Sequence, residues 1–533
     1  MVKDIPVVKV ENEKQFYDFY VRDVFQDIFN GEKFPGSFGP TKIYEFVDYW
    51  TLRQRSLQLF RENPYAVGII RRIIRNEIFT GIVPDAIPLG NIIWPDMDDT
   101  ERTNRATELG EMLTTYFNLY GDDHEVFDYK KQQTFGEFQA QVRMEALLCG
   151  DGIVVSRINP VTNLPCWEWI NGNHIRTPMG YIPPKGYYIK HGVEMDAAGR
   201  HVAYHVERMV NGQLENYRVP VYGPQSGRIQ AKMVYGTERV IDDVRSIPIL
   251  ACMLYMLKDI DRYRDAEQRA AVVNAMLPMF IKRPSSVPVG SRPTAAFTIP
   301  ARLDGIAVPP PVNGLVDAPK PNIAGMMPGT VFEDLAPGEE PVSFNTNRPN
   351  VNYKAFEEAI LDVFCWVLEI PPEIGVMKFT NSFSASRQAN NEFEIYLKYR
   401  TYKNAKDFCQ LIYREFVVQA VITGQLQLPG FIYALVDPKE WRKKDAWLNC
   451  AWSGVSRPSV NMLQDVQAAK EAIDLGISTF DIQARKISGM SHRAVIQRLR
   501  KEYDAMDQLG IVPSVKETTS GNPAYEDPEN GEE

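Results

Sequence analysis

The sequence predicts a mainly helical α+β fold, on three observations. Apolar residues recur at spacings of three and four over much of the first 150 residues, along 246–282 and again after residue 351, which is typical of helices. Residues 152–238 instead hold short alternating runs between Gly, Pro and Asn clusters, which is typical of strands. Between residues 278 and 349 lie 14 of the 37 prolines, a density that excludes long helices.

Length and composition place the chain among ordinary folded proteins. It has 533 residues, 44% of them apolar and 24% charged, which is enough for a substantial core and several structural units. The formal net charge of −9 argues against a surface that binds nucleic acid throughout, although not against one past which DNA slides. The longest apolar stretch, 247–257, is interrupted by Pro248 and is far shorter than the roughly 20 residues of a membrane helix. We therefore expect no membrane association.

The first helices have recognisable ends. Asn63 is a plausible N-cap for a helix that begins at Pro64, and further helices are expected over 98–119 and 134–149. Thr134 followed by Glu137 makes a capping-box signature, and Gly150 ends that helix.

In the β-rich region, the segment 196–199 is a turn that joins two runs into a hairpin. His201 and His205 follow it on one predicted strand, which would put both on one face. A core or surface role is expected for both rather than a zinc site.

The second half alternates helices with Pro-rich intervals. A long helix is expected over 246–282, which Pro278 kinks or ends, then a shorter one over 351–370 and another long one over 387–423. Helices that bracket a Pro-rich insertion can pair antiparallel and hold it at their far end. A Trp-rich passage follows, then two helices over 462–475 and 491–509. The last twenty residues carry six acidic side chains and one Lys, and we expect them to be disordered.

Motifs for catalysis or cofactor binding are absent from the sequence. It contains no intact P-loop, dinucleotide fingerprint, HExxH, GxSxG or SxxK pattern, and its six cysteines include no CxxC pair. We interpret the cysteines as reduced core thiols in a cytosolic setting, and we predict neither a cofactor nor enzymatic activity.

Three clusters admit a second interpretation. Asp96, Asp98 and Asp99 could hold a divalent ion, but acidic residues also belong before a helix for capping reasons. Asp259, Asp261 and Asp265 lack the glycine and terminal Glu of a calcium loop, so a solvated helix face is favoured. The interleaved basic and aromatic residues of 398–406 could contact phosphate along one helix edge, and the favoured alternative is an amphipathic helix with solvated lysines. The residues in question are Tyr399, Tyr402, Lys403 and Lys406.

Several stretches, in order along the chain, resemble the portal proteins of tailed bacteriophages, specifically the lambda-type portal family. The matching segments are 61–82, 138–153, 263–267, 370–373, 381–389 and 452–476. Asp151 replaces the usual Glu of the family's "GE" turn. The sequence that the family usually has before the first long helix is also different here, and only residues 242–248 correspond to it.

The resemblance implies a portal-type subunit of a cyclic ring with a central channel, built from wing, stem, clip and crown parts. The wing would comprise residues 1–245, the first stem helix 246–284, the clip 285–350 and the second stem helix 351–370. The tunnel loop would be 371–386, followed by a long helix returning through the wing over 387–457, crown helices over 458–513 and an acidic tail over 514–533.

By the same resemblance, the chain would sit at the portal vertex of the virion, after assembly in the host cytoplasm. Its partners would be further copies of itself in a ring, expected to be a dodecamer, and double-stranded DNA in the channel. They would also include the terminase large subunit, to which ATP hydrolysis belongs, the head-tail adaptor, and the major capsid and scaffolding proteins.

Candidate site residues follow from these assignments. Those of the tunnel loop are Lys378, Asn381, Ser382 and Arg387. Those of the acidic stem lining are Glu357, Glu358 and Asp362. Those for partner docking in the clip are Arg292, Arg302 and Asp304. An acidic bore would repel phosphate and keep DNA from adhering.

Two rival functions remain open from the sequence. One is a metal-dependent nucleic-acid-processing enzyme that uses Asp96, Asp98 and Asp99. The other is a ring adaptor that never encloses DNA, which a measured channel width would separate from a portal.

Overall fold

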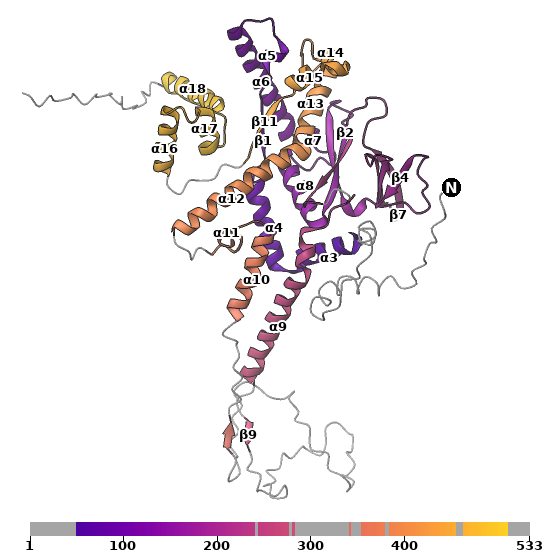
Figure 1. Cartoon of the computed structure of the whole chain (residues 1–533), viewed down its shortest axis with the longest axis vertical. Coiled ribbons are helices and arrows are strands. Elements are labelled where there is room, and N and C mark those ends of the chain that lie inside the picture. The colour runs from indigo at the N-terminus through magenta and orange to yellow at the C-terminus, as the bar shows by residue number, and fades with distance from the viewer. Residues whose placement is uncertain are drawn as a thin grey trace, which may run out of the picture. The chain divides into compact units, whose positions relative to one another are not determined.

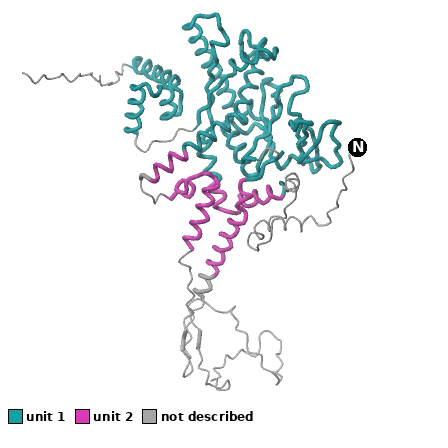
Figure 2. Tube along the Cα trace, in the orientation of Figure 1, with its two compact units in different colours: residues 1–50, 70–248, 394–533 teal, residues 51–69, 249–393 magenta. Residues whose placement is uncertain are grey.

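The computed structural model describes residues 49–239, 243–276, 280–282, 340–342, 353–378, 383–454 and 462–509, and it confirms a mainly helical α+β fold (Figure 1). The chain divides into two compact units (Figure 2). Unit 1 contains residues 1–50, 70–248 and 394–533, and unit 2 contains 51–69 and 249–393. Residues 51–69, which we had assigned to the wing, therefore group with the two predicted stem helices.

The helical part of unit 1 is built around an aromatic core. Helices α6 (Asp99–Asp122), α8 (Phe135–Cys149) and α13 (Gln410–Ile422) contribute to it. The rings of Tyr120 and Phe416 are stacked, with their centroids 4.4 Å apart. The Thr134 side chain accepts the amide of Glu137 while the Glu137 carboxylate accepts that of Thr134, which confirms the predicted capping box. Shorter elements complete this part: β1 (Val83–Ala86), α5 (Gly90–Ile93), α7 (His124–Phe127), α14 (Phe431–Val436), a 3-10 turn (Pro438–Glu440), α15 (Trp441–Trp447) and β11 (Cys450–Ser453), which pairs antiparallel with β1.

Two antiparallel sheets form the β-rich region as predicted. One has the order β3-β2-β8, with β2 at Asp151–Ile158, β3 at Pro165–Asn171 and β8 at Ala231–Tyr235. The other has the order β4-β5-β6-β7, with β4 at Tyr187–Lys190, β5 at Val193–Asp196, β6 at His201–Val210 and β7 at Gln213–Pro220. The two sheets share a buried apolar cluster to which β2, β5, β6 and β7 all contribute. The predicted turn joins β5 to β6, with Gly199 at a φ of +77°.

The prediction that His201 and His205 share a face is wrong, because the register between β5 and β6 shifts at Glu194 and Met195. His205 Nε2 lies 3.0 Å from Glu194 Oε2, whereas the ring of His201 contacts Tyr204, the neighbour of His205 on β6. Since neighbouring strand residues point to opposite faces, the two histidines are on opposite sides of the sheet.

A buried ion pair fixes the chain just before the first long helix of unit 2. Arg245 donates to both carboxylate oxygens of Asp151, at 2.8 and 2.6 Å, and to three backbone carbonyls. The Ser246 amide also donates to Asp151, at 2.9 Å. Gly150, at a φ of +85°, lies so close that an added Cβ would be 2.2 Å from the Ser246 carbonyl oxygen. Arg245 belongs to residues 242–248, where this sequence departs from the usual lambda-type sequence. Its pairing with Asp151 holds these residues against the start of β2.

A second buried network joins residues of three helices, and all of these residues lie in unit 1. Glu77, at the end of α4 (Pro64–Glu77), accepts from Arg143 of α8 at 2.6 Å and from the Tyr396 hydroxyl of α12 (Phe383–Asn404) at 2.6 Å. Arg400 of α12 lies 3.6 Å from the same carboxylate. Burial alone would raise the pKa of Glu77, but the Arg143 guanidinium outweighs it and holds that pKa below its usual range.

The long helix predicted over 387–423 begins earlier and has three parts. Helix α12 starts at Phe383, a π-helical turn spans Ala405–Cys409, and α13 ends at Ile422. At the C-terminal end the structure has three helices where we predicted two: α16 (Met462–Asp474), α17 (Phe480–Ser488) and α18 (His492–Gln508). We missed α17, which is short and begins at a Thr479 cap.

Unit 2 contains the helices on either side of the Pro-rich stretch, together with most of α3 (Tyr49–Glu62). A 3-10 turn (Ile249–Met253) precedes α9 (Leu254–Met276), so this helix is shorter than the predicted 246–282. Helix α10 spans Tyr353–Val367 and α11 spans Pro372–Val376. Strands β9 (Phe280–Lys282) and β10 (Glu340–Val342) pair antiparallel, so the two ends of the Pro-rich stretch come together.

Asn63 ties the start of α4 to α9. Its Oδ1 accepts the amides of Tyr65 and Ala66 at 2.9 and 3.0 Å, which confirms the predicted cap. Its Nδ2 donates to Asp261 at 2.9 Å, so part of the acidic face predicted to be solvated is used in packing.

Candidate functional site

Helix α10 has one buried face and one uncovered face. Leu361, Phe364 and Cys365 are buried, at the three- and four-residue spacing of a helical stripe, and Leu368 continues it just past the helix end. Tyr353 and Phe356, at the start of α10, contact the ring of Tyr263 on α9, with centroids 5.5 and 5.0 Å apart. The two helices beside the insertion are thus in direct aromatic contact, and Figure 1 shows their ribbons next to each other.

The uncovered face of α10 is apolar. Phe356, Val363, Trp366 and Val367 are all exposed: Trp366 is 80% exposed, and Phe356 remains exposed beside its contact with Tyr263. Single exposed apolar residues are common, but four on one helix form a surface that water does not solvate well. We refer to these four residues below as the α10 stripe. Sequence analysis placed Phe356, Val363 and Val367 on a helix without separating the covered from the uncovered face, and it did not single out Trp366.

The three acidic stem candidates have different surroundings. Glu357 accepts a hydrogen bond from the Tyr65 hydroxyl, and burial together with the Glu357 carboxylate raises the pKa of Tyr65 to about 12. Glu358 lies 3.9 Å from Lys354 and 3.2 Å from Lys378. Asp362 is exposed. Of the three, Asp362 therefore presents its charge most openly.

The predicted tunnel loop, 371–386, is less irregular than we expected. It contains α11, and α12 already begins at Phe383. Glu369 and Met377, two non-glycine residues at φ values of 56° and 60°, stand on either side of α11. Gly375 packs on the Cys365 thiol so closely that an added Cβ would lie 2.6 Å from its Sγ, and burial raises the pKa of that thiol to about 11.

The tunnel-loop candidates fall partly outside the described residues. Lys378 is exposed and its Nζ donates to Glu358, so the structure brings together two candidates that the sequence had treated separately. Arg387 is exposed on α12. Asn381 and Ser382 lie outside the described residues, as do the clip candidates Arg292, Arg302 and Asp304 and the acidic tail.

The basic and aromatic residues of 398–406 are largely exposed, and several of them make contacts within unit 1. Tyr399 donates to Glu238 at 3.1 Å, and the Lys406 ammonium lies 5.9 Å from the centre of the Tyr402 ring. Burial lowers the pKa of Lys403. This arrangement favours the amphipathic-helix interpretation of the segment.

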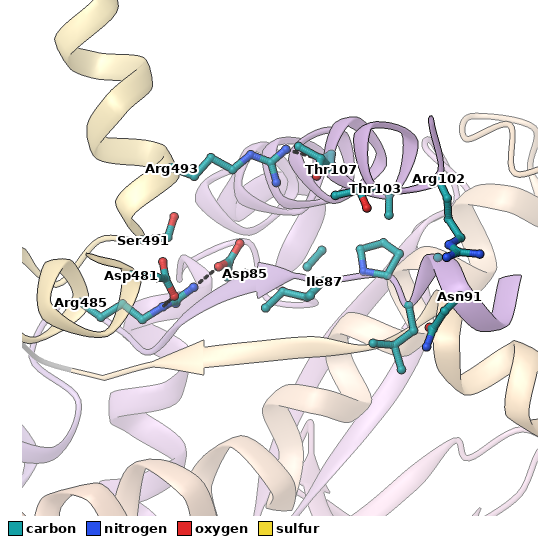
Figure 3. Close-up of a pocket in the computed structure, with 15 residues that line it drawn as sticks. Asp85, Ile87, Asn91, Arg102, Thr103, Thr107, Asp481, Arg485, Ser491 and Arg493 are labelled. Atoms are coloured by element: carbon teal, nitrogen blue, oxygen red, sulfur yellow. Dashed lines mark hydrogen bonds and ion pairs between the residues drawn. The ribbon is translucent and has the colours of Figure 1, made fainter. Parts of the chain in front are cut away.

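A pocket of about 500 Å³ lies in unit 1, between β1, α5 and α6 on one side and the C-terminal helices on the other (Figure 3). Arg485 reaches across to Asp85 and to Ser453, the latter at 2.6 Å, and also pairs with Asp481 at 2.8 Å. Arg493 contacts Glu111 and the Thr107 carbonyl. The arginines at this joint are thus engaged in attaching α17 and α18, with carboxylates as their partners.

The acidic cluster at 96–99 has a local structural role. The Asp98 side chain caps α6 by accepting the Thr100 amide at 3.1 Å, and Asp99 pairs with Arg102. Across the described ranges, no group of three potential metal ligands comes together.

None of the helices in the described part of the chain is long and apolar enough to cross a bilayer. The six cysteines are all free thiols, four of them buried and Cys252 exposed.

Helices α9 and α10 thus pair beside the insertion, and α10 leaves an apolar face uncovered. Residues 33–400 match the model of the family described as phage portal protein, lambda family, and the chain therefore belongs to that family. Portal proteins are structural assembly proteins rather than enzymes. The resemblance seen in the sequence is confirmed.

Among the solved structures with detectable similarity are chains from gene transfer agent particles. A chain from the neck of a native particle, computed with C12 symmetry, is 11% identical, with 87% of this chain and 98% of that chain covered and a TM-score of 0.39. A chain from the virion of the native particle is 12% identical over the same shares, with a TM-score of 0.38.

Proposed function

We propose that this chain is the subunit of a portal ring, with twelve copies in the virion, through which double-stranded DNA is packaged and later ejected. The ring would occupy the unique capsid vertex, after assembly in the host cytoplasm alongside the major capsid and scaffolding proteins. Membership of the portal family supports this role. So does the placement of α9 and α10, in contact with each other and on either side of the Pro-rich stretch.

The observation that carries the proposal is the α10 stripe. One face of α10 is buried, while the other exposes Trp366 and three further apolar side chains. At about 25 cal/mol per Å² of apolar area, covering such a face is strongly favourable. A neighbouring subunit would supply that cover in a ring, because every copy brings the same uncovered helix.

The charge on the chain suits a channel that does not retain DNA. Each copy has a formal net charge of −9, and this charge adds up around a ring. Glu357, Glu358 and Asp362 lie on α10, and their carboxylates would repel phosphate wherever they face the bore. Lys378 and Arg387 are candidates for transient contacts with DNA, and they would offset the repulsion locally.

Residues 285–350 would form the clip that first docks the terminase large subunit and then the head-tail adaptor. The pairing of β9 with β10 supports a projecting module, because it closes the Pro-rich stretch at its base. Hydrolysis of ATP would belong to the terminase, which agrees with the missing P-loop in this sequence.

Mass photometry and electron microscopy of the purified chain test this proposal. We expect a closed ring with a channel wide enough for a duplex of about 20 Å, and DNA packaging when terminase, procapsid and ATP are added. A particle whose opening is too narrow for a duplex would identify a ring adaptor instead. A chain that stays monomeric even with scaffolding protein would contradict the proposal.

A further inference from the structure

Helix α4 is divided into a buried side and an exposed side. Its buried residues are Ala66, Ile69, Ile70, Ile73 and Glu77. Its exposed residues are Pro64, Gly68, Arg71 and Arg75. The exposed residues recur every three or four positions, so they lie along one side of the helix. We refer to these four residues below as the α4 face.

The α4 face is positively charged and contains no carboxylate. Arg71 and Arg75 are exposed, and neither forms an ion pair with another described residue. Glu77 is the one acidic residue of the helix, and it is buried on the opposite side, where it pairs with Arg143. A favourable interaction with the helix dipole accounts for Arg75, which lies in the last turn, but not for Arg71. The face therefore carries positive charge that the described part of the chain leaves unneutralised.

Gly68 leaves the middle of the α4 face bare. After proline, glycine is the least favourable residue in the interior of a helix. Packing does not require it here, because an added Cβ would meet no atom within 4 Å. Glycine does allow another molecule to approach the backbone closely. We therefore interpret Gly68 as room for a ligand that lies against the helix beside the two arginines.

The spacing of the two arginines suits a phosphate backbone. Four residues of helix span about 6 Å along the axis, and each strand of duplex DNA carries one charge per about 3.4 Å of its own axis. Arg71 and Arg75 can therefore reach phosphates of the same strand. The guanidinium group also presents a fork of N–H donors that can bind two phosphate oxygens at once.

We infer that the α4 face binds the phosphate backbone of duplex DNA, with Arg71 and Arg75 as the contacting residues. The inference rests on the proposed function, because that function brings duplex DNA to every copy of the chain. It adds two phosphate-binding residues to the candidates Lys378 and Arg387. Contacts with phosphate carry no base-sequence information, which suits a protein that must accept a whole genome.

The salt dependence of DNA binding tests this inference in the full chain. Fluorescence anisotropy with a labelled duplex measures affinity between about 50 and 200 mM salt. Arg71→Ala with Arg75→Ala should lower the affinity roughly tenfold or more at the lowest salt. It should also reduce the slope of log affinity against log salt by at least about 1.8, because each lost phosphate contact removes about 0.9.

Three further variants separate phosphate binding from a structural role. Arg71→Lys with Arg75→Lys should keep the wild-type slope, because the positive charges remain. Gly68→Glu should weaken binding, because it places a carboxylate on the α4 face. The matched control is Arg498→Ala with Arg500→Ala, which removes two exposed arginines from α18 and should keep the wild-type slope.

Mass photometry of each variant separates DNA binding from assembly. An assembled Arg71→Ala, Arg75→Ala variant with an unchanged slope would contradict the inference. A variant that no longer forms rings would identify the α4 face as a contact between subunits and would also contradict it. Displacement of the duplex by polyglutamate as readily as by unlabelled DNA would indicate an acidic protein partner instead. A wild-type chain that stays monomeric would contradict the proposed function, whereas its salt slope would still decide whether Arg71 and Arg75 bind phosphate.

Discussion

Two regions of the molecule place their apolar and charged residues in opposite ways. Around α8 and the two sheets of unit 1, charged groups such as Asp151 and Arg245 are buried and fully hydrogen-bonded, and the apolar side chains between the sheets are covered. On α10 of unit 2, Trp366 is 80% exposed while Glu358 and Lys378 pair at the surface. The first region pairs buried charges such as these internally, whereas the second leaves an apolar face that needs a partner.

The largest effect is expected at the buried ion pair. Asp151→Ala leaves the Arg245 guanidinium buried without its carboxylate, which should lower the free energy of unfolding by about 3–5 kcal/mol. Urea denaturation of the purified chain measures it. The matched control is Arg200→Ala, which removes an exposed arginine paired with Asp196 and should cost less than about 1 kcal/mol. Equal costs for the two variants would remove the contrast between the regions.

The two faces of α10 should respond differently to truncation. Phe364→Ala opens a cavity on the buried face and should destabilise the isolated chain by about 3–5 kcal/mol. Trp366→Ala should leave that stability within about 0.5 kcal/mol yet weaken ring assembly by about 2 kcal/mol, or roughly thirtyfold. Mass photometry across a concentration series measures assembly. A Trp366→Ala ring that forms as readily as wild type would show that the α10 stripe is not an interface.

The acid sensitivity of unit 1 should depend in part on Glu194. The Arg218 guanidinium, together with His205 and Tyr181, lowers the pKa of this buried carboxyl from 4.5 to about 2. Because the unfolded chain binds the proton more tightly, the stabilisation is complete above pH 4.5 and is lost as the pH falls towards 2. The full shift would correspond to about 3.4 kcal/mol, and we expect about 2 kcal/mol because the partner Arg218 is partly exposed and solvent screens its charge.

Unfolding curves at several pH values between 7 and 2 test the role of this carboxyl. Glu194→Gln should be less stable than wild type at pH 7 and should lose less stability on acidification. The matched control is Glu215→Gln, on the exposed part of β7, which should keep the wild-type profile. If the free energy of unfolding of Glu194→Gln depends on pH in the same way as that of wild type, other groups are responsible for the acid sensitivity.

The smallest effect on stability is expected at the exposed pair of unit 2. Lys378→Ala should change the free energy of unfolding by less than about 1 kcal/mol and leave the ring assembled. We expect it to alter DNA packaging or retention, which a nuclease-protection assay on filled heads measures. Lys398→Ala, in another exposed pair, is the control. Dissociated subunits would mean that Lys378 belongs to the assembly contacts instead of the channel.

Local signals were the part of this structure that could be predicted. The Asn63 cap, the Thr134 capping box and the turn after Asp196 depend on residues two to five positions apart, and all three are present. The register shift that separates His201 from His205 could not be predicted, because it depends on how β6 pairs with β5. The same holds for the contact of Lys378 with Glu358, twenty residues away along the chain.

The amino-acid sequence by itself determined the main helices, the β-rich region, several capped helix ends and the resemblance to portal proteins, because hydrophobic period and capping chemistry act over a few neighbouring residues. Only the tertiary structure decided which face of α10 is covered and that α16 to α18 lack a core. An amphipathic pattern shows that a helix has an apolar side. Burial of that side depends on distant segments, and for α10 we propose that the missing segments belong to neighbouring copies.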